Sequence, residues 1–387
     1  MMKPSLLICI NSLRSGGAER VVSLLLNHLK DDFDIHLALY SHIIEYDIPE
    51  GIKIFDLKQS ENDSQAAMLL KLPWLSYKVS RYCKKNNIMH SVAFLNRPCY
   101  INALMHSCWG YKGRVVMCER THQTTMLAMR SRLTRMITKF LIKASYNRAD
   151  LVLANSNSMK KDLHDNLGVK KPIEVIYNPV DIRELQSRMM NPVSIALPED
   201  NFYFVAVGNF RREKNFPLLL NALKLVNDSK CKLLLVGDGP LKGQLVQQAK
   251  ENGISEQVIF CGRDNNPFKY IHKCDSFVLC SDVEGFPNVL LEAIACGKPV
   301  ISTDCRSGPR EMLAPASDPE KQLSGNYSEE EFGILTPVNN APVMAEAMKK
   351  MMSDENLRSR LTEKAARRAL DFDISIVRKY FQEAFAG

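Results

Sequence analysis

Two glutamates bracket a polar turn in the stretch Cys280 to Glu292, which reads CSDVEGFPNVLLE. The apolar residues Phe277 to Leu279 before the turn predict a strand. The apolar run Val289 to Cys296 after it predicts a helix that Gly297 can end. A loop that follows a strand and opens a helix is where open α/β sheets bind phosphate-bearing ligands. The backbone N–H groups of Gly285 to Asn288 are therefore expected to face phosphate oxygens.

The spacing of the two glutamates indicates separate roles. Eight positions separate Glu284 from Glu292, which on one continuous helix corresponds to roughly 12 Å at about 1.5 Å per residue. Carboxylate pairs that hydrolyse one glycosidic bond lie roughly 5–9.5 Å apart. Two contacts along an extended ligand therefore fit better than a joint acid and base. From spacing alone, two solvated glutamates remain the alternative.

Two further loops carry residues suited to an anionic ligand. Gly16 and Gly17 follow the first predicted strand, where missing side chains let a backbone approach phosphate. Arg211, Arg212 and Lys214 follow a strand that ends before Gly208, and three cations in one loop suit an anionic ligand. A solvated basic turn is the alternative for this second loop.

The elements that must position these loops alternate between strands and helices. Such alternation predicts mostly parallel sheets covered on both faces, and the 387 residues suggest two domains. The predicted strands of the first series are Ser5 to Ile10, Ile35 to Tyr40, Val92 to Leu95, Val115 to Cys118, Leu151 to Ala154 and Ile173 to Tyr177. Those of the second are Phe202 to Val207, Lys232 to Val236, Val258 to Cys261, Ser276 to Leu279 and Val300 to Thr303.

The segments between and after these series are expected to differ in kind. Residues from about Asp181 to Asp200 look irregular and form the candidate linker, and Pro315 to Glu331 reads as a polar surface loop. In the last helix, Val377, Tyr380, Phe381 and Ala384 have the spacing of one apolar face.

The positive charge is concentrated in the first half of the chain. Through Asp181 there are 25 Lys and Arg against 16 Asp and Glu, whereas the remainder has 26 against 27. The first half therefore faces something anionic. Its stretch Arg120 to Ala149 has seven basic residues and no acidic one, and an apolar stripe of Leu133, Met136, Ile137, Phe140, Leu141 and Ala144. A basic amphipathic helix of this kind lies either on anionic lipid or against the protein core. No aromatic platform accompanies the charge, so nucleic acid is not expected as a partner.

The remaining composition limits the compartment and the cofactors. No apolar run approaches the roughly 18–20 residues of a membrane span, and the early run Leu6 to Ile10 fits a strand better than a signal peptide. The 11 scattered cysteines include no Cys-x-x-Cys pair, so buried reduced thiols are expected. These features predict a cytoplasmic protein with no bound metal.

The motifs together resemble the retaining glycosyltransferases of family 4. Glu284-Gly-Phe-Pro-Asn-Val-Leu-Leu-Glu292 is similar to the Glu-x7-Glu motif of that family. Each matching segment is short, and the resemblance rests on their order and spacing over nearly the whole chain. The other segments are Ser15 to Arg20, Asn178 to Asp181, Gly208 to Asn215, Val236 to Pro240 and Ser307 to Glu311.

The resemblance implies an α/β protein of the GT-B fold. Two Rossmann-like domains would face a central cleft, and a C-terminal helix would pack back towards the N-terminal domain. An acceptor-binding domain is expected at residues 1–181 with the helix at about 371–387. A nucleotide-sugar-binding domain is expected at residues 182–370.

The resemblance also assigns the residues that act on the donor. Glu284 would contact the donor sugar and Glu292 the ribose hydroxyls. Lys214 matches a lysine of the family's basic loop, but Asn209 stands where many members have an arginine. Arg211 is the candidate replacement, with Arg212 as the second choice. The other implied donor contacts are Gly16, Gly17, Gly208, Gly262, Arg263, Gly285, Phe286, Pro287, Asn288 and Val289.

A histidine and three charged residues of the first half complete the implied site. His122 is the candidate for a catalytic contact to the donor sugar, although Gln123 follows it where the family commonly has Asp or Gly. Arg120 is its rival. The implied acceptor contacts are Glu19, Arg20 and Arg120.

The implied activity is a metal-independent, retaining hexosyl transfer that needs no cofactor. The enzyme would transfer a hexose or N-acetylhexosamine from a UDP-sugar to a polyprenyl-diphosphate-linked glycan. It would lie peripherally on the inner face of the cell membrane. The alternatives are a different acceptor in lipopolysaccharide or capsule assembly, and a nucleotide-sugar-binding protein without catalysis. A Rossmann oxidoreductase is disfavoured because the chain lacks the fingerprint loop.

Overall fold

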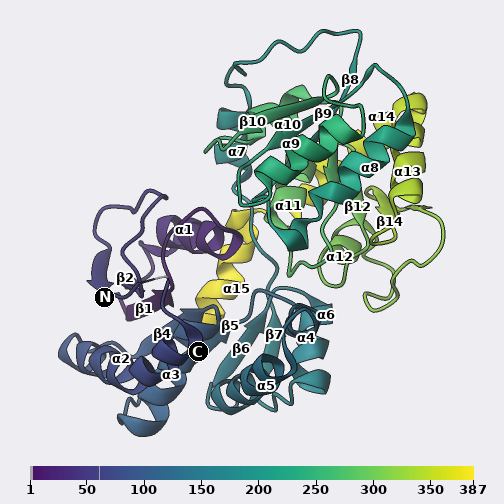
Figure 1. The fold of residues 1–387 in the computed structure, drawn as a ribbon. Helices are drawn as coiled ribbons and strands as arrows, with labels where there is room; N and C mark the ends of the chain where they lie inside the picture. Colours follow the sequence, from purple (N-terminus) through teal and green to yellow (C-terminus); the bar gives the residue numbers. More distant parts are fainter. Residues whose placement is uncertain (1–2, 61) are drawn as a thin grey trace. The chain divides into compact units, whose positions relative to one another are not determined.

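The computed structural model describes residues 3–60 and 62–387, which fold into two compact units (Figure 1). The first unit contains Met1–Pro179 and Ile374–Gly387, and the second contains Val180–Asp373. Each unit has a seven-stranded sheet with helices on both faces. The predicted class, two α/β domains built on parallel sheets, is confirmed.

The first unit is a parallel sheet in the order β3-β2-β1-β4-β5-β6-β7. Its strands are β1 Ser5–Ile10, β2 Asp34–Leu39, β3 Lys53–Asp56, β4 His90–Phe94, β5 Arg114–Cys118, β6 Leu151–Ala154 and β7 Ile173–Val175. Its helices are α1 Gly17–Leu29, α2 Gln65–Lys85, α3 Asn96–Cys108, α4 Gln123–Ala128, α5 Arg132–Tyr146, α6 Asn157–Lys161, the π-helix η1 Asp162–Asn166 and α15 Ile374–Ala386.

Two apolar cores hold the helices of the first unit on opposite faces of its sheet. One core contains side chains of α2, α3 and α5, and the other contains side chains of α1 and α15. The C-terminal helix α15 packs against α1, β4 and β5. The chain therefore returns to the first unit at its end, as the sequence predicted.

The second unit has the sheet order β10-β9-β8-β11-β12-β14-β13, in which only β13 is antiparallel among the described strands. Its strands are β8 Phe202–Val207, β9 Cys231–Val236, β10 Val258–Gly262, β11 Ser276–Leu279, β12 Val300–Thr303, β13 Ser328–Glu329 and β14 Ile334–Thr336. Its helices are α7 Ile182–Met189, the 3₁₀ turn η2 Arg212–Lys214, α8 Phe216–Val226, α9 Lys242–Glu251, α10 Phe268–Lys273, α11 Asn288–Ala295, α12 Pro309–Leu313, α13 Ala341–Ser353 and α14 Glu355–Leu370.

The predicted strands are found where the sequence has continuous apolar runs, since parallel strands covered on both faces consist of such runs. Four residues of β11, for example, are all buried. The predicted buried thiols are also confirmed: the cysteines are free, and Cys9, Cys118, Cys231, Cys280 and Cys296 are buried.

The predicted loop Pro315 to Glu331 has neither helix nor strand except for the two-residue strand β13. Two predictions about local structure were wrong. The candidate linker contains α7, which Asp181 caps by accepting a hydrogen bond from Glu184 N at 2.9 Å. Tyr380 of α15 is exposed, whereas Val377, Phe381 and Ala384 of the same predicted face are buried.

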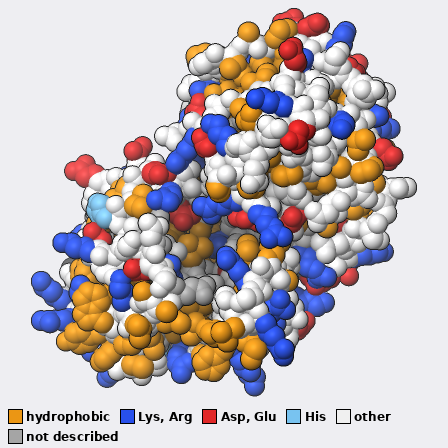
Figure 2. Space-filling view, in the orientation of Figure 1, with side chains coloured by type: hydrophobic (Ala, Val, Ile, Leu, Met, Phe, Trp, Pro, Cys, Tyr) orange, Lys and Arg blue, Asp and Glu red, His pale blue; other side chains and the backbone are white. Residues whose placement is uncertain are grey.

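The apolar stripe of α5 faces outward. Leu133, Met136, Ile137 and Phe140 are exposed, and Leu141 and Ala144 are half-buried. The stripe therefore does not pack into the core, and apolar side chains gather on this part of the first unit's surface (Figure 2). None of the helices in residues 3–60 and 62–387 combines the length and apolar character needed to cross a bilayer.

Candidate functional site

The strand order of the second unit brings two of the predicted loops together. The chain runs outward from β8 through β9 to β10, then returns to place β11 on the other side of β8. The loops after β8 and β11 therefore leave neighbouring strands at the point where the order reverses. Ligands of open α/β sheets bind at such points.

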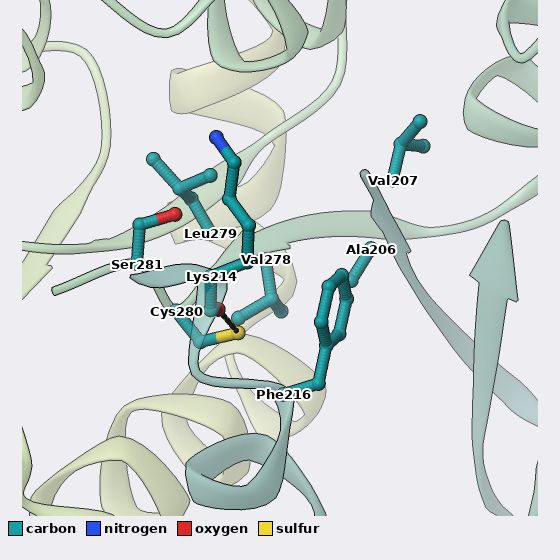
Figure 3. Close-up of a pocket in the computed structure, with 8 residues that line it drawn as sticks. All are labelled: Ala206, Val207, Lys214, Phe216, Val278, Leu279, Cys280 and Ser281. Atoms are coloured by element: carbon teal, nitrogen blue, oxygen red, sulfur yellow. Dashed lines mark hydrogen bonds between the residues drawn. The ribbon is translucent and has the colours of Figure 1, made fainter. Parts of the chain in front are cut away.

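The two loops meet through Lys214 and Glu284. The Lys214 ammonium donates to Glu284 Oε1 at 2.6 Å, and the Ser281 hydroxyl donates to the same oxygen at 2.7 Å. Figure 3 shows the ammonium and the Ser281 hydroxyl on the same side of the loop. The Cys280 thiol lies on the other side and donates to the Lys214 carbonyl at 3.1 Å. The structure thus pairs the predicted cation with the predicted carboxylate.

The pair is partly withdrawn from water. The Lys214 and Glu284 side chains are 25% and 10% exposed. Burial by itself lowers the pKa of Lys214, but the carboxylate of Glu284 outweighs it, so the net pKa is raised. Lys214 is therefore a cation throughout the neutral pH range.

A polar network behind the pair fixes both loops. Asn215 has a left-handed backbone (φ +47°) and donates from Nδ2 to Asp282 Oδ1 at 2.7 Å and to Asn339 Oδ1 at 2.8 Å. The backbone N–H of Asp282 donates to the Glu213 carbonyl at 2.9 Å. Lys214 and Glu284 are thus held from both sides by backbone and amide contacts.

Glycines allow the loops around this pair to approach one another. A Cβ on Gly237 would lie 1.9 Å from the Gly208 carbonyl oxygen. A Cβ on Gly308 (φ +94°) would lie 2.6 Å from Pro287 Cδ and 2.9 Å from Phe286 Cα. The Ser307 hydroxyl also donates to the Gly285 carbonyl at 2.5 Å. The turn before α11 therefore lies directly against the segment that precedes α12.

The start of α11 has the character that the sequence predicted. Asn288 is its first residue, Pro287 precedes it, and no side chain caps it. Val289 lies in its first turn, and Glu292 is buried one turn later. Glu284 lies outside this helix. The assumption of one continuous helix therefore does not hold, although the two carboxylates do lie on separate elements.

The remaining predicted residues of the second unit lie at strand ends. Gly208 follows β8, Gly262 ends β10, and exposed Arg263 comes next. Gly237 N donates to the Gly262 carbonyl at 2.8 Å, so these turns share one edge of the sheet.

Phe210 explains how the basic loop presents its arginines. Its ring is fully buried against Phe216, with the ring centroids 4.9 Å apart. Arg211 and Arg212 follow it and are both exposed, as is Asn209 before it. Within the described residues, no acidic side chain forms an ion pair with Arg211 or Arg212, so both cations are available to an anionic ligand.

In the first unit, the glycine loop closes on its own helix. Gly16 caps α1 in an extended conformation, and a Cβ there would lie 2.3 Å from Glu19 Oε2. Glu19 therefore folds back over Gly16. The loop is tied down by Ser15 N, which donates to Glu45 Oε2 at 2.8 Å. Gly17 and Arg20 lie in the first turn of α1.

Glu119 and Arg120 form a buried polar centre after β5. The Glu119 carboxylate accepts from Arg120 N, Thr121 N, Gln123 Nε2 and Tyr146 Oη at 2.8–3.1 Å. Burial raises its pKa. The Arg120 guanidinium donates to Asn178 Oδ1 at 2.8 Å and lies 4.8 Å from the Phe94 ring centroid.

Arg120 is incompletely satisfied. Burial lowers its pKa, and its Nε and Nη2 atoms have no hydrogen-bond partner in the described part of the chain. Buried polar groups are normally paired, so these two nitrogens are candidate donors to an anionic ligand.

His122 has a defined local role. It is buried and caps α4, where its Nδ1 accepts from Thr125 N at 3.4 Å and lies 2.9 Å from Thr125 Oγ1. Asp162 Oδ2 lies 3.6 Å from Nδ1 and accepts from Thr124 N.

The sequence did not single out several residues that shape the site. Ser281 and Asp282 lie in the motif stretch but had no assigned role, and Asp304 pairs with Arg310 in a buried ion pair. Spacing along the chain cannot reveal them, because their partners are distant in the sequence. Among the described residues, no group of three or more His, Cys, Asp or Glu side chains is arranged to hold a metal ion.

Family models match both halves of the chain. The model described as "Glycosyltransferase Family 4" matches residues 15–184, and the model described as "Glycosyl transferases group 1" matches residues 190–368.

The chain is 37% identical to the N-acetylgalactosamine-N,N'-diacetylbacillosaminyl-diphospho-undecaprenol 4-alpha-N-acetylgalactosaminyltransferase of Campylobacter jejuni, over 95% of each chain. A second transferase of that organism is the GalNAc-alpha-(1->4)-GalNAc-alpha-(1->3)-diNAcBac-PP-undecaprenol alpha-1,4-N-acetyl-D-galactosaminyltransferase. It is 24% identical, over 100% of this chain and 99% of its own.

Two solved structures share the fold. Anabaena HepE in complex with UDP has a TM-score of 0.75 at 19% identity, over 99% of each chain. Sucrose-phosphate synthase from Thermosynechococcus elongatus has a TM-score of 0.82 at 16% identity, over 99% of this chain and 98% of its own. These likenesses confirm the predicted GT-B fold.

Proposed function

Because the chain belongs to glycosyltransferase family 4, we propose that it moves an N-acetylhexosamine or hexose from a UDP-sugar to a polyprenyl-diphosphate-linked glycan. The chain is a retaining glycosyltransferase of the hexosyltransferase class. The observation that carries the proposed substrates is the relative with 37% identity, whose name specifies a diphospho-undecaprenol acceptor, because the similarity spans 95% of both chains.

The second unit supplies the proposed donor site. The diphosphate lies across the backbone of Gly285 to Asn288 at the start of α11, with Val289 behind it. Glu292 holds the ribose hydroxyls, and Glu284 holds the sugar. The turns at Gly208, Gly262 and Arg263 line the nucleobase. The position of Glu284 outside α11 supports separate roles for the two carboxylates.

Transfer requires the bond between the sugar C1 and the β-phosphate oxygen to break while the acceptor hydroxyl oxygen bonds to C1. The hydroxyl proton passes to the departing phosphate, on the same face of the sugar. Lys214 and Arg211 stabilise the negative charge that develops on the diphosphate. The Lys214 ammonium lies 2.6 Å from Glu284 Oε1, and this carboxylate favours the charged form of the lysine. The loop is therefore positively charged before the donor binds.

The first unit carries the proposed acceptor contacts. Glu19 and Arg20 extend from the first turn of α1 as acceptor contacts, whereas the preceding Gly16 and Gly17 of the same loop are proposed contacts of the donor. Arg120 presents buried nitrogens without partners in the described chain, which suits an acceptor phosphate. His122 is the proposed contact of this unit to the donor sugar.

The enzyme works without a metal and lies peripherally on the inner face of the cell membrane. The basic first unit supports this placement, with 25 Lys and Arg against 16 Asp and Glu through Asp181. Anionic lipid headgroups attract such a surface by about 1 kcal/mol per basic residue close to it.

Incubating the purified enzyme with a panel of UDP-sugars and synthetic polyprenyl-diphosphate-linked saccharides tests the proposal. We expect a glycolipid heavier by one hexose or N-acetylhexosamine with at least one donor. Transfer only to a lipopolysaccharide or capsule acceptor would replace the proposed acceptor. UDP-sugar binding without any product would contradict catalysis.

A further inference from the structure

Helices α2 and α5 of the first unit expose apolar side chains along one face each. On α2 these are Leu70, Trp74 and Tyr77, and on α5 they are Leu133, Met136, Ile137 and Phe140. The spacings i, i+4, i+7 and i, i+3, i+4, i+7 each define a single helical face. Leu70 is 82% exposed and Phe140 is 69% exposed. We call these seven residues the α2–α5 surface.

The two apolar faces belong to one side of the first unit. Helix α3 contacts both α2 and α5, and all three helices bury their other faces in the same core on one face of the sheet. The outward faces of α2 and α5 therefore point away from the sheet in the same general direction. Figure 2 shows apolar side chains gathered over this part of the unit, with Lys and Arg around them. An exposed apolar area of this kind marks an interaction surface.

The charge around the α2–α5 surface has one sign. Residues 64–149 include 15 Lys and Arg but a single acidic residue, Glu119, which is buried. Exposed Arg81, Arg130 and Arg132 and half-buried Lys139 have no ion-pair partner in the described chain. A second protein would need a matching acidic apolar surface, whereas an anionic bilayer offers both charge and hydrocarbon.

Aromatic side chains of α2 suit a bilayer interface. Trp74 is half exposed, and the Lys78 ammonium lies 3.9 Å from its ring centroid. Tyr77 is exposed and contacts Trp109 edge to face, with the ring centroids 5.2 Å apart. Trp and Tyr concentrate at membrane interfaces, where one end of the ring is apolar and the other is hydrated.

The connectivity relates this surface to the edge that carries the acceptor contacts. Helix α2 follows the carboxyl end of β3, and α5 follows β5 by way of α4. Leu70 and Leu133 lie in the first two turns of their helices, towards that edge. The same edge of the sheet carries Arg120 and His122.

We propose that the α2–α5 surface docks on an anionic bilayer, with Leu70, Trp74 and Phe140 inserted at the level of the headgroups. This deepens the proposed function, because it names the surface through which the first unit meets a membrane-borne acceptor. Lys and Arg around the seven residues bind lipid phosphate, and the apolar side chains enter the acyl boundary.

Flotation with vesicles that contain about 30% phosphatidylglycerol in phosphatidylcholine tests the surface. The double variant Leu70→Gln/Phe140→Gln should bind about 100-fold more weakly than the wild type, because each buried apolar side chain contributes about tenfold or more. The matched control is Met190→Gln/Leu225→Gln, which changes two exposed apolar residues of the second unit. It should bind like the wild type.

Tryptophan fluorescence reports the same event without relying on affinity. The chain has only Trp74 and Trp109, so vesicles should shift the wild-type emission to the blue, and Trp74→Phe should abolish the shift. Equal binding by the two double variants, or an unchanged shift in Trp74→Phe, would overturn the proposal. So would concentration-dependent dimerisation that Leu70→Gln/Phe140→Gln abolishes without vesicles.

A water-soluble acceptor with a short prenyl chain separates this inference from the proposed function. Leu70→Gln/Phe140→Gln should transfer sugar to that acceptor at the wild-type rate and lose activity only towards long-chain acceptor in vesicles. A wild type that binds vesicles yet transfers to neither acceptor would refute the proposed function and leave the docking surface supported. Equal losses on both acceptors would overturn the docking role.

Discussion

The ion pair between Lys214 and Glu284 predicts a measurable part of the stability of the second unit. Glu284→Gln keeps the shape of the side chain and an oxygen that can accept from Ser281, but removes the charge that faces the ammonium at 2.6 Å. Breaking a buried pair costs about 3–5 kcal/mol, whereas exposed pairs contribute about 1 kcal/mol or less. Lys214 keeps 25% of its side chain in water. We therefore expect a loss of about 2–3 kcal/mol in the free energy of unfolding of the second unit.

Calorimetry measures this loss. UDP identifies the transition of the second unit, since a ligand raises the unfolding temperature of the unit that binds it. For a unit of this size, a loss of that magnitude lowers Tm by about 5–10 °C. The matched control is Lys242→Met, which breaks the exposed pair with Asp238 in the same unit. It should lower Tm by about 2 °C or less. Equal shifts in the two variants would refute the reasoning.

A double-mutant cycle isolates the pair itself. Lys214→Met leaves the Ser281 hydroxyl as the one side-chain donor to the Glu284 carboxylate among the described residues. The double variant Lys214→Met/Glu284→Gln removes both charges, so its loss should be smaller than the sum of the single losses by about 1–3 kcal/mol. Additive losses would contradict the account of the pair.

Three further predictions concern ligand binding and packing. Burial alone lowers the pKa of Lys214, and the Glu284 carboxylate outweighs this effect. As the pH rises, Glu284→Gln should therefore lose UDP affinity at a lower pH than the wild type, as measured by calorimetric titration. Identical curves of UDP affinity against pH for the two proteins would contradict this. Gly308→Ala should destabilise the second unit by about 2–3 kcal/mol in denaturant unfolding, because the added Cβ would contact Pro287 and φ is positive. Gly243→Ala places its Cβ in open space and should not destabilise the unit. Equal stabilities of the two variants would contradict the contact. Arg120→Met removes a proposed donor to the acceptor phosphate, so it should raise the acceptor KM about tenfold and leave UDP affinity unchanged. A change in UDP affinity alone would contradict the assignment of Arg120 to the acceptor site.

The sequence was most informative where burial leaves a continuous apolar pattern. Strands such as Leu151–Ala154 and Ser276–Leu279 were predicted with their observed bounds because both faces are covered. The edge strand Lys53–Asp56 was missed, because half of it is exposed and its residues do not form an apolar run. Helix α7 was missed because only Leu185 in it is buried, which leaves almost no periodic signal.

The contact between the two motif loops could not be predicted from the sequence. The motif order identified Glu284 and Lys214, yet their contact depends on β8 and β11 being neighbours, which sheet order decides. The outward direction of the α5 stripe was also beyond the sequence. An amphipathic pattern specifies that a face is apolar, and only the packing of α3 and α5 against the sheet shows that Phe140 remains uncovered.

The proposed enzyme transfers sugar onto a polyprenyl-diphosphate-linked glycan with retention of configuration. The most direct test of this transfer is the anomeric configuration of the new linkage, measured by NMR on the product formed from a UDP-α-sugar and a synthetic polyprenyl-diphosphate-linked saccharide. We predict a single α-linked sugar added to the acceptor glycan, with one UDP released per sugar. A β linkage, or free sugar and UDP without a lengthened acceptor, would contradict the account.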